Sequence, residues 1–309
     1  MNHFILTIDT EEDRLKNKNS FEYSNLKQLN RFHNFCNKFA IKQTYFTTYG
    51  ALKNNHFIDF YNNCSIDKVE IAAHLHSWAN PPFQSNDLKN TRPFMYEYNE
   101  EVKKEKISFL KDAIKNITGE YPLSFRAGRF GIDINNDFEL LVNEGFRYDS
   151  SIAAKADFRS FVGQNKIGPD FTSYSEKAFY VDKNGLITRD KENSILELPV
   201  TIFSSGLRNI LNSFSKNIYL RKVVNLISKP IWLRPATDIT PQQVIQMIEK
   251  HKNDTLVMFL HSNELDHKTN SYFKTKEEIE YLYYFLEEIF RYINEKDYNS
   301  IKINEFHKQ

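Results

Sequence analysis

The sequence predicts an α/β fold built on a parallel sheet, and two patterns in its 309 residues indicate this. Short apolar runs alternate with stretches of helical apolar periodicity, which is the order of successive βαβ units. Several runs are almost continuously apolar, as expected of strands buried on both faces. Ionisable residues follow where those runs end. In a barrel of parallel strands these ends share one face, so we expect the functional residues there.

An open, doubly wound sheet has the same alternation of strands and helices. That fold usually carries a glycine-rich phosphate loop after its first strand, and no such loop follows residues 4–8. The missing loop counts against the open sheet, although both folds fit the alternation. Because the sequence contains no internal repeat and no low-complexity segment, we expect one catalytic domain spanning residues 1–309.

The first half of the chain has the clearest element signals. We expect strands at residues 4–8, 43–48, 69–74, 123–127 and 146–148. We expect helices at residues 25–40, 55–64, 96–117 and 136–144. Apolar residues recur at helical spacing in 25–40. Gly119 and then Pro122 form a stop signal after the third of these helices.

The second half begins with a stretch that lacks periodicity. Residues 154–193 mix Gly, Pro, Asp and Lys with scattered aromatic residues, and we expect an elaborated loop insertion rather than a separate domain. Further strands are expected at residues 195–202, 255–260 and 300–303. Helices are expected at residues 209–226, 241–251 and 276–293. Thr240 is suited to cap the second of these helices.

Composition narrows the class of protein. The net charge of +1 gives no bulk attraction to nucleic acid, so we expect no nucleic-acid partner. No apolar run reaches the ~20 residues that span a bilayer, and Met1 leads almost directly into the first strand without a cleavable leader. We therefore expect a soluble, cytoplasmic protein. Cys36 and Cys64 lack metal-site spacing, and a buried free thiol is expected at Cys36.

The first strand ends in an acidic cluster of Asp9, Glu11, Glu12 and Asp13, followed by a polar loop that should cover the site. If the strand continues, its period of two places Asp9, Glu11 and Asp13 on one side. Like charges at this spacing repel unless a metal ion or arginines compensate them. The alternative is a solvated loop after an edge strand.

Three other strand ends carry ionisable pairs, namely His74 with His76, Arg126 with Arg129, and His261 with Glu264. A carboxylate with two imidazoles suits a divalent metal such as Zn²⁺. An arginine near the carboxylates would lower their pKa and orient the one that acts as base. The alternatives are arginines that only neutralise the acidic cluster and a core histidine at position 261.

Together these motifs resemble the polysaccharide deacetylase family of carbohydrate esterases. The resemblance is carried by five segments that follow the family's order along nearly the whole chain. They are Leu6-Thr7-Ile8-Asp9-Thr10-Glu11-Glu12-Asp13, Glu70-Ile71-Ala72-Ala73-His74-Leu75-His76-Ser77-Trp78, Phe125-Arg126-Ala127-Gly128-Arg129-Phe130-Gly131, Tyr148-Asp149-Ser150-Ser151 and Leu260-His261-Ser262-Asn263-Glu264.

The resemblance implies a distorted (β/α)₇-type barrel and a metal-dependent hydrolase of carbon–nitrogen bonds other than peptide bonds. It would remove an N-acyl group, usually acetyl, from a sugar or glycan precursor in surface-glycan metabolism. By motif, Asp9 is the general base, Arg126 holds Asp9, and His261 is the general acid. Glu11 and His74 are metal ligands by the same comparison.

Two departures from the family pattern affect the metal shell. Trp78 stands where the usual second histidine lies, so His76 is expected to serve as the second histidine ligand. Thr10 separates residues that are usually adjacent aspartates, and Glu12 or Asp13 could take the place of Glu11. The carboxylate ligand therefore stays open among the three acids, and Zn²⁺ is the expected ion.

We expect Trp78, Arg129 and Glu264 to contact the substrate. The predicted helix at 209–226 and its exit are basic, through Lys216, Arg221, Lys222 and Lys229. A solvated helix and a phosphate-bearing or lipid-linked sugar at a membrane surface are the two interpretations of that segment. Two other functions stay open: a deformylase or non-sugar amide hydrolase on the same fold, and a non-catalytic carbohydrate-binding protein. The oligomeric state is not predicted.

Overall fold

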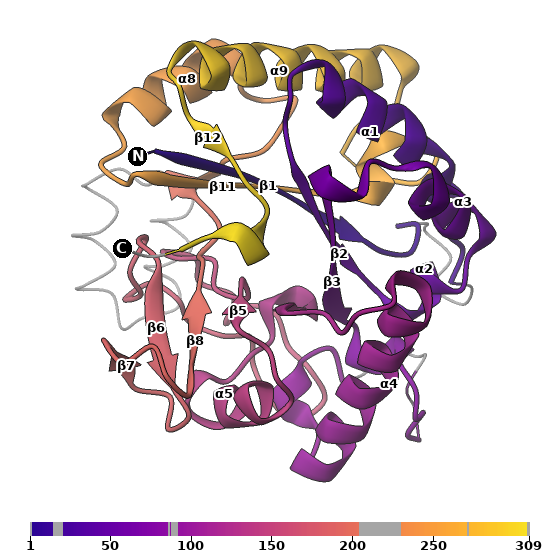
Figure 1. The fold of residues 1–309 in the computed structure, drawn as a ribbon, viewed down its shortest axis with the longest axis vertical. Coiled ribbons are helices and arrows are strands. Elements are labelled where there is room, and N and C mark those ends of the chain that lie inside the picture. The colour runs from indigo at the N-terminus through magenta and orange to yellow at the C-terminus, as the bar shows by residue number, and fades with distance from the viewer. Residues whose placement is uncertain are drawn as a thin grey trace.

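A parallel sheet forms the centre of the computed structural model, which describes residues 2–14, 21–85, 87, 92–203, 230–270 and 272–307. Within the described residues, successive strands pair in parallel in the order β11-β1-β2-β3-β4-β5-β8 (Figure 1). They are β11 (Thr255–His261), β1 (His3–Thr10), β2 (Gln43–Thr47), β3 (Val69–Leu75), β4 (Ser124–Ala127), β5 (Tyr148–Asp149) and β8 (Ser194–Glu197). The predicted α/β class with a parallel sheet is confirmed.

Helices lie around the outside of this sheet, with α8 and α9 along one side and α1 and α3 beside them (Figure 1). The α-helices are α1 (Leu29–Lys38), α2 (Tyr49–Leu52), α3 (Asn55–Asn63), α4 (Glu100–Thr118), α5 (Ile134–Asn143), α8 (Pro241–Lys250) and α9 (Lys276–Glu295). Single 3₁₀ turns occur at Ser24–Gln28, Ile66–Lys68, Ser77–Ala79, Met95–Glu97, Gly128–Phe130, Ser262–Leu265 and Ile303–Glu305.

The remaining strands extend or flank the sheet. They are β6 (Phe179–Asp182), β7 (Ile187–Thr188), β9 (Ile202–Phe203), β10 (Ile231–Trp232) and β12 (Asn299–Ser300). β12 pairs with β1, and β9 pairs with β10 alone. Single backbone hydrogen bonds link the region after β8 to β11, because Thr201 N–H donates to Val257 O at 3.1 Å and Phe259 N–H donates to Leu233 O at 3.2 Å. This linkage is consistent with a distorted barrel.

Most predicted boundaries hold to within a few residues, with three differences. α4 begins at Glu100 instead of residue 96, because the Asn99 side chain caps it by accepting from Val102 N–H. Within the predicted loop insertion, β6 and β7 form a hairpin that pairs antiparallel with β8. The final strand is shorter than predicted. The helix predicted at 209–226 lies outside the described residues.

Strand register brings the predicted motifs to one end of the sheet. Asp9 on β1 is in register with His261 on β11, and His74 on β3 is in register with Arg126 on β4. These pairs join segments separated by up to 252 positions and all lie at carboxyl ends of parallel strands. The site predicted from scattered motifs therefore has a common location.

The core fills the space between the sheet and its helices. Phe4 of β1 packs against Phe290 of α9, with ring centroids 6.0 Å apart. Leu286 of α9 is fully buried, whereas Tyr284 is 47% exposed on the opposite face of the same helix. Among the described residues, none of the helices has the length and apolar character required to cross a membrane.

This packing predicts different costs for two substitutions on α9. Leu286→Ala should lower the free energy of unfolding by about 2–5 kcal/mol, because it leaves a cavity in the core. Tyr284→Ala, on the exposed face, should change it by no more than about 0.5 kcal/mol. Urea denaturation followed by circular dichroism measures both. Equal losses would contradict the assignment of the buried face.

Candidate active site

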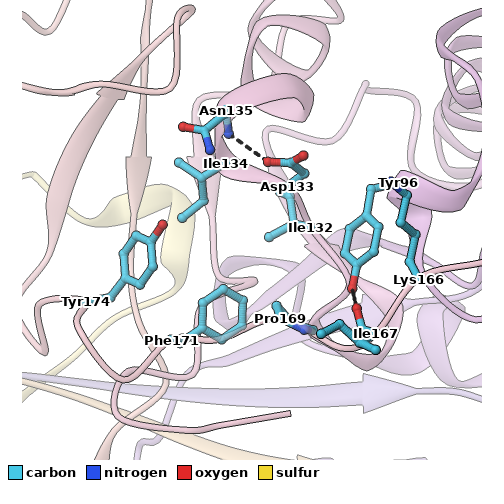
Figure 2. Close-up of a pocket in the computed structure, with 10 residues that line it drawn as sticks. All are labelled: Tyr96, Ile132, Asp133, Ile134, Asn135, Lys166, Ile167, Pro169, Phe171 and Tyr174. Atoms are coloured by element: carbon cyan, nitrogen blue, oxygen red, sulfur yellow. Dashed lines mark hydrogen bonds between the residues drawn. The ribbon is translucent and has the colours of Figure 1, made fainter. Parts of the chain in front are cut away.

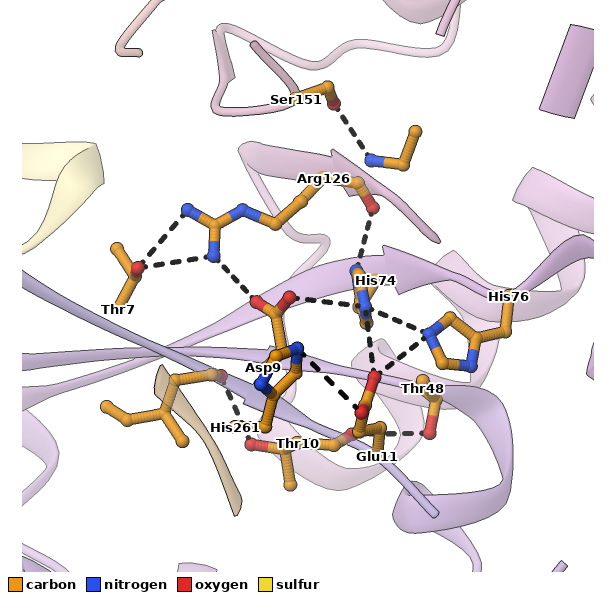
Figure 3. Close-up of polar contacts among 12 residues, drawn as sticks. Thr7, Asp9, Thr10, Glu11, Thr48, His74, His76, Arg126, Ser151 and His261 are labelled. Atoms are coloured by element: carbon orange, nitrogen blue, oxygen red, sulfur yellow. Dashed lines mark hydrogen bonds and ion pairs between the residues drawn. The ribbon is translucent and has the colours of Figure 1, made fainter. Parts of the chain in front are cut away.

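The carboxyl ends of β1, β3, β4 and β11 converge on a single buried cluster of polar side chains (Figure 3). It contains six of the predicted site residues, which are Asp9, Glu11, His74, His76, Arg126 and His261. Each has less than a tenth of its surface exposed. Charged groups buried this deeply require close partners, and the partners define what each residue can do.

Arg126 is a fully buried arginine that holds Asp9. Its Nη1 donates to Asp9 Oδ1 at 2.6 Å and to Thr7 Oγ1 at 3.2 Å. Its Nε and Nη2 donate to the carbonyl and hydroxyl oxygens of Ser150, both at 2.8 Å. The guanidinium also lies 4.1 Å from the centroid of the Phe46 ring. Asp9 is consequently fixed through one oxygen, and its Oδ2 faces His74 at 3.5 Å.

Glu11, His74 and His76 point their ligand atoms at a common position (Figure 3). Glu11 Oε2 lies 3.2 Å from His76 Nε2 and 3.8 Å from His74 Nε2, and the two Nε2 atoms are 3.1 Å apart. The other ring nitrogens are engaged: His74 Nδ1 donates to Arg126 O at 3.0 Å, and His76 Nδ1 donates to Glu12 Oε1 at 3.0 Å. These outer contacts leave both Nε2 atoms available as ligands.

The electrostatics of this cluster favour positive charge at its centre. Burial opposes ionisation of Glu11, but His261, Arg14 and the two histidines lower its pKa well below the usual range. Burial likewise opposes the charged form of His76, yet Glu12 and Glu11 raise its pKa to about 10. One carboxylate and two oriented imidazoles are a common ligand set for Zn²⁺ with open positions. The donor set therefore fits a divalent metal ion.

His261 is oriented from behind by Glu264. Its Nδ1 donates to Glu264 Oε1 at 2.5 Å, and Arg234 Nη2 donates to the same oxygen at 2.6 Å. Burial opposes ionisation of Glu264, but Arg234 and His261 lower its pKa to about 2. The expected substrate contact for Glu264 is corrected here, because this residue has no exposed surface and lies beneath His261. Glu264 positions the imidazole instead.

Trp78 and Arg129 form a wall beside the histidines. The Trp78 ring stacks on His76 with centroids 4.3 Å apart, and the Arg129 guanidinium lies 5.3 Å from the Trp78 ring centroid. Trp78 is only 3% exposed, so it supports His76 and offers little free surface for stacking a sugar. A Cβ on Gly128 would lie 2.7 Å from the His76 ring, which explains the glycine at this close approach.

Asp13 and Glu12, the other two acids of the first motif, have separate contacts. The Asp13 carboxylate accepts from the backbone and side chains of Ser24 and Asn25, at distances of 2.5 to 3.0 Å. β1 ends at Thr10, so the strand period no longer places Asp13 beside Glu11. Glu12 contacts the outer nitrogen of His76. The structure therefore brings Glu11, and not Asp13, to the two ligand nitrogens.

Three residues of the site were not singled out from the sequence. Arg14 covers the cluster, with Nε 3.3 Å from Glu11 Oε1 and Nη2 2.9 Å from His261 Nε2. Asn263 Nδ2 donates to Glu11 Oε1 at 3.0 Å. Arg234 follows β10 and belongs to no motif. The only sequence feature that points to Arg14 as a site residue is its position directly after the acidic cluster. No sequence feature points to Arg234.

A separate cavity of about 290 Å³ lies between the start of α5 and the insertion (Figure 2). Its walls include Tyr96, Asp133, Lys166, Phe171 and Tyr174. The Tyr96 hydroxyl donates to Ile167 O at 2.7 Å, which ties the insertion to the 3₁₀ turn before α4. None of the predicted site residues lines this cavity. The metal-ligand cluster and this cavity are thus different places.

Comparison with known proteins identifies the fold. No sequence-family model matches the chain, and no curated protein does either. A protein from Mycobacterium smegmatis assigned as a polysaccharide deacetylase aligns with a TM-score of 0.52 and 14% identity, over 99% of this chain and 94% of that one. A protein from Pseudomonas aeruginosa with the same assignment aligns at 0.53 and 14%, over 97% and 87%.

A 4-alpha-glucanotransferase from Thermococcus litoralis also aligns, with a TM-score of 0.53 and 15% identity. The alignment covers 98% of this chain but 38% of that enzyme. The chain therefore has the fold found in structures assigned as polysaccharide deacetylases. Because a glucanotransferase has it too, the reaction must be argued from the site.

The ligand geometry predicts that His74→Ala abolishes stoichiometric binding of a divalent metal, because one of two imidazole ligands is lost. Elemental analysis of protein reconstituted with Zn²⁺ measures this. His56→Ala is the matched control, since His56 is an exposed histidine on α3. Equal metal content in the wild type and His74→Ala would contradict the assignment.

The contacts of Asp13 and Glu12 predict that one residue matters for folding stability and the other for metal affinity. Asp13→Ala should lower the free energy of unfolding by roughly 2–4 kcal/mol, because it leaves buried donors unpaired, while metal stoichiometry stays intact. Glu12→Gln should weaken metal affinity about 10–100-fold, because it alters the partner of His76 Nδ1. Chemical denaturation and metal titration separate the two. Metal loss in a folded Asp13→Ala protein would contradict the purely structural role given to Asp13.

Proposed function

We propose that the protein is a metal-dependent hydrolase that removes an N-acyl group, most readily acetyl, from a sugar or sugar precursor. The observation that carries this proposal is the close grouping of the Glu11–His74–His76 ligand cluster with two differently held proton-transfer groups. Asp9 is fixed by Arg126, and His261 is fixed by Glu264. Amide hydrolysis requires a base for water, an acid for the leaving nitrogen and stabilisation of the oxyanion.

Each side chain has a defined task in this reaction. A divalent ion held by Glu11, His74 and His76 would polarise the acyl carbonyl and acidify water. Asp9 accepts the proton of the attacking water through Oδ2, because Oδ1 is engaged by Arg126. His261 donates a proton from Nε2 to the leaving amine, since its Nδ1 is held by Glu264.

Arg14 must release His261 before that proton transfer. Its Nη2 donates to His261 Nε2 at 2.9 Å, and a nitrogen that accepts this bond cannot carry the transferable proton. Arg14 Nη1 also donates a hydrogen bond to the Tyr272 hydroxyl oxygen at 3.1 Å. Substrate entry would therefore displace the Arg14 guanidinium from His261. The same side chain can then bind the entering molecule.

The sugar substrate is supported by the fold shared with structures assigned as polysaccharide deacetylases and by the motif resemblance. We further propose that residues 1–309 form one catalytic domain and that it acts on a surface-glycan precursor in the cytoplasm. The insertion bordering the cavity in Figure 2 would contribute to substrate selection.

The proposal predicts the activity of two variants. Asp9→Asn and His261→Ala should each lower kcat about 10²–10⁴-fold, because each removes one proton-transfer group. Both should retain bound metal, since neither contributes to the ligand cluster. Acetate or formate release from a panel of N-acylated sugars, measured beside His56→Ala, tests this. A metal-loaded wild type that releases no acyl group, with sugar binding unchanged in Asp9→Ala, would instead indicate a binding protein.

A further inference from the structure

Four arginines surround the candidate site, and three of them have a carboxylate partner. Arg126 pairs with Asp9 at 2.6 Å, Arg14 with Glu11 at 3.3 Å, and Arg234 with Glu264 at 2.6 Å. Of the other acids of the first motif, Glu12 pairs with His76, and Asp13 accepts hydrogen bonds from Ser24 and Asn25. The acidic groups of the site are therefore matched without the fourth arginine.

Arg129 is that fourth arginine. It forms no ion pair with any described residue, and the segments outside the described ranges contain no aspartate or glutamate. Its side chain is exposed and lies over Trp78, which itself stacks on His76. It is also within electrostatic range of Arg14, Glu11 and Glu12. The Arg129 guanidinium thus lies at the entrance without an ion-pair partner among the described residues, and the Trp78 ring separates it from His76.

The backbone at Arg129 is strained to place it there. Arg129 has φ 55° and ψ 26°, and the next residue, Phe130, has φ 54°. Left-handed backbone is unfavourable for residues other than glycine, and such strain concentrates at functional sites. Gly128 permits the same turn to approach His76 closely. The turn therefore directs a cation toward the site at an energetic cost.

Neutralisation of the acidic cluster does not account for Arg129, because each acid already has a partner. Desolvation of the guanidinium and repulsion from Arg14 lower the pKa of Arg129, so the two cations destabilise one another. A cation bound by Glu11, His74 and His76 would add further positive charge. Arg129 and Arg14 thus bring two positive charges together beside the ligand cluster, and an anion placed between them would relieve their repulsion.

We propose that Arg129, with Arg14 beside it, binds an oxyanion on the substrate. The substrate class is then an acylated sugar that carries a phosphate or a carboxylate. Arginine suits this task because its planar donors match both groups in a bidentate manner. Trp78 holds the guanidinium in place by cation–π contact. This inference rests on the proposed function, and it narrows the substrate of the same site.

Calorimetric binding tests this inference without turnover. The probes are N-acetylglucosamine 1-phosphate, the uronate of N-acetylglucosamine and the neutral methyl glycoside, all added to metal-loaded protein carrying Asp9→Asn. We expect at least one anionic probe to bind about tenfold or more tightly than the neutral one. Arg129→Gln should reduce that ratio to about threefold or less. Which anionic probe binds more tightly identifies phosphate or carboxylate as the source.

Two further variants control this experiment. Arg129→Lys keeps the charge but loses the planar donors, so it should preserve only part of the ratio. Arg31→Gln removes an arginine of α1 that stacks on Tyr283 at 4.2 Å and pairs with Glu280 at 2.9 Å, so it contacts α9 and none of the site residues, and it should leave the ratio unchanged. A ratio near one in the Asp9→Asn protein, or a ratio unaffected by Arg129→Gln, overturns the inference. Absence of acyl release in separate assays would refute the proposed function and leave this ratio standing.

Discussion

The ion pair between Arg126 and Asp9 is the interaction on which the site depends. A guanidinium without exposed surface is stable only if its donors find acceptors, and here Asp9, Thr7 and Ser150 supply them from three separate segments. The pair therefore ties β1 to β4 and to the segment after β5. It also leaves Asp9 with one oxygen directed at the histidines, which is the arrangement required of a positioned base. The hydrogen bonds that stabilise the buried Arg126 guanidinium are therefore the same ones that position Asp9 for the proposed catalysis.

Hydrogen bonds outside the ligand cluster also orient its two histidines. Each histidine uses its Nδ1 for a contact outside the cluster, and this decides that Nε2 faces Glu11. Trp78 supports His76 by stacking. A His-x-His pair can work here because His76 directly follows the end of β3 at Leu75, and its Nε2 lies 3.1 Å from that of His74. The altered motif thus keeps two imidazoles at one point by different local geometry.

The fold alone does not decide the reaction, since structures assigned as polysaccharide deacetylases and a glucanotransferase share it. The strand ends of this chain differ among themselves in how their charges are paired. Three arginines are engaged by carboxylates, and Arg129 is held on Trp78 without one. The chemistry of the entrance therefore differs from that of the interior. The interior positions proton-transfer groups, whereas the entrance is suited to select charge.

The sequence by itself determined the α/β class, most strand and helix positions, and the identity of Asp9, His74, Arg126 and His261 as residues that meet at strand ends. Apolar runs and capping signals are local, so they can be recognised without a structure. It could not choose among Glu11, Glu12 and Asp13, because that choice depends on β1 ending at Thr10 and on Ser24 and Asn25 engaging Asp13. The places of Arg14, Arg234 and Glu264 were decided only by tertiary structure. Their partners lie across strands and loops far apart in the chain, and only register and packing bring such residues within hydrogen-bonding distance.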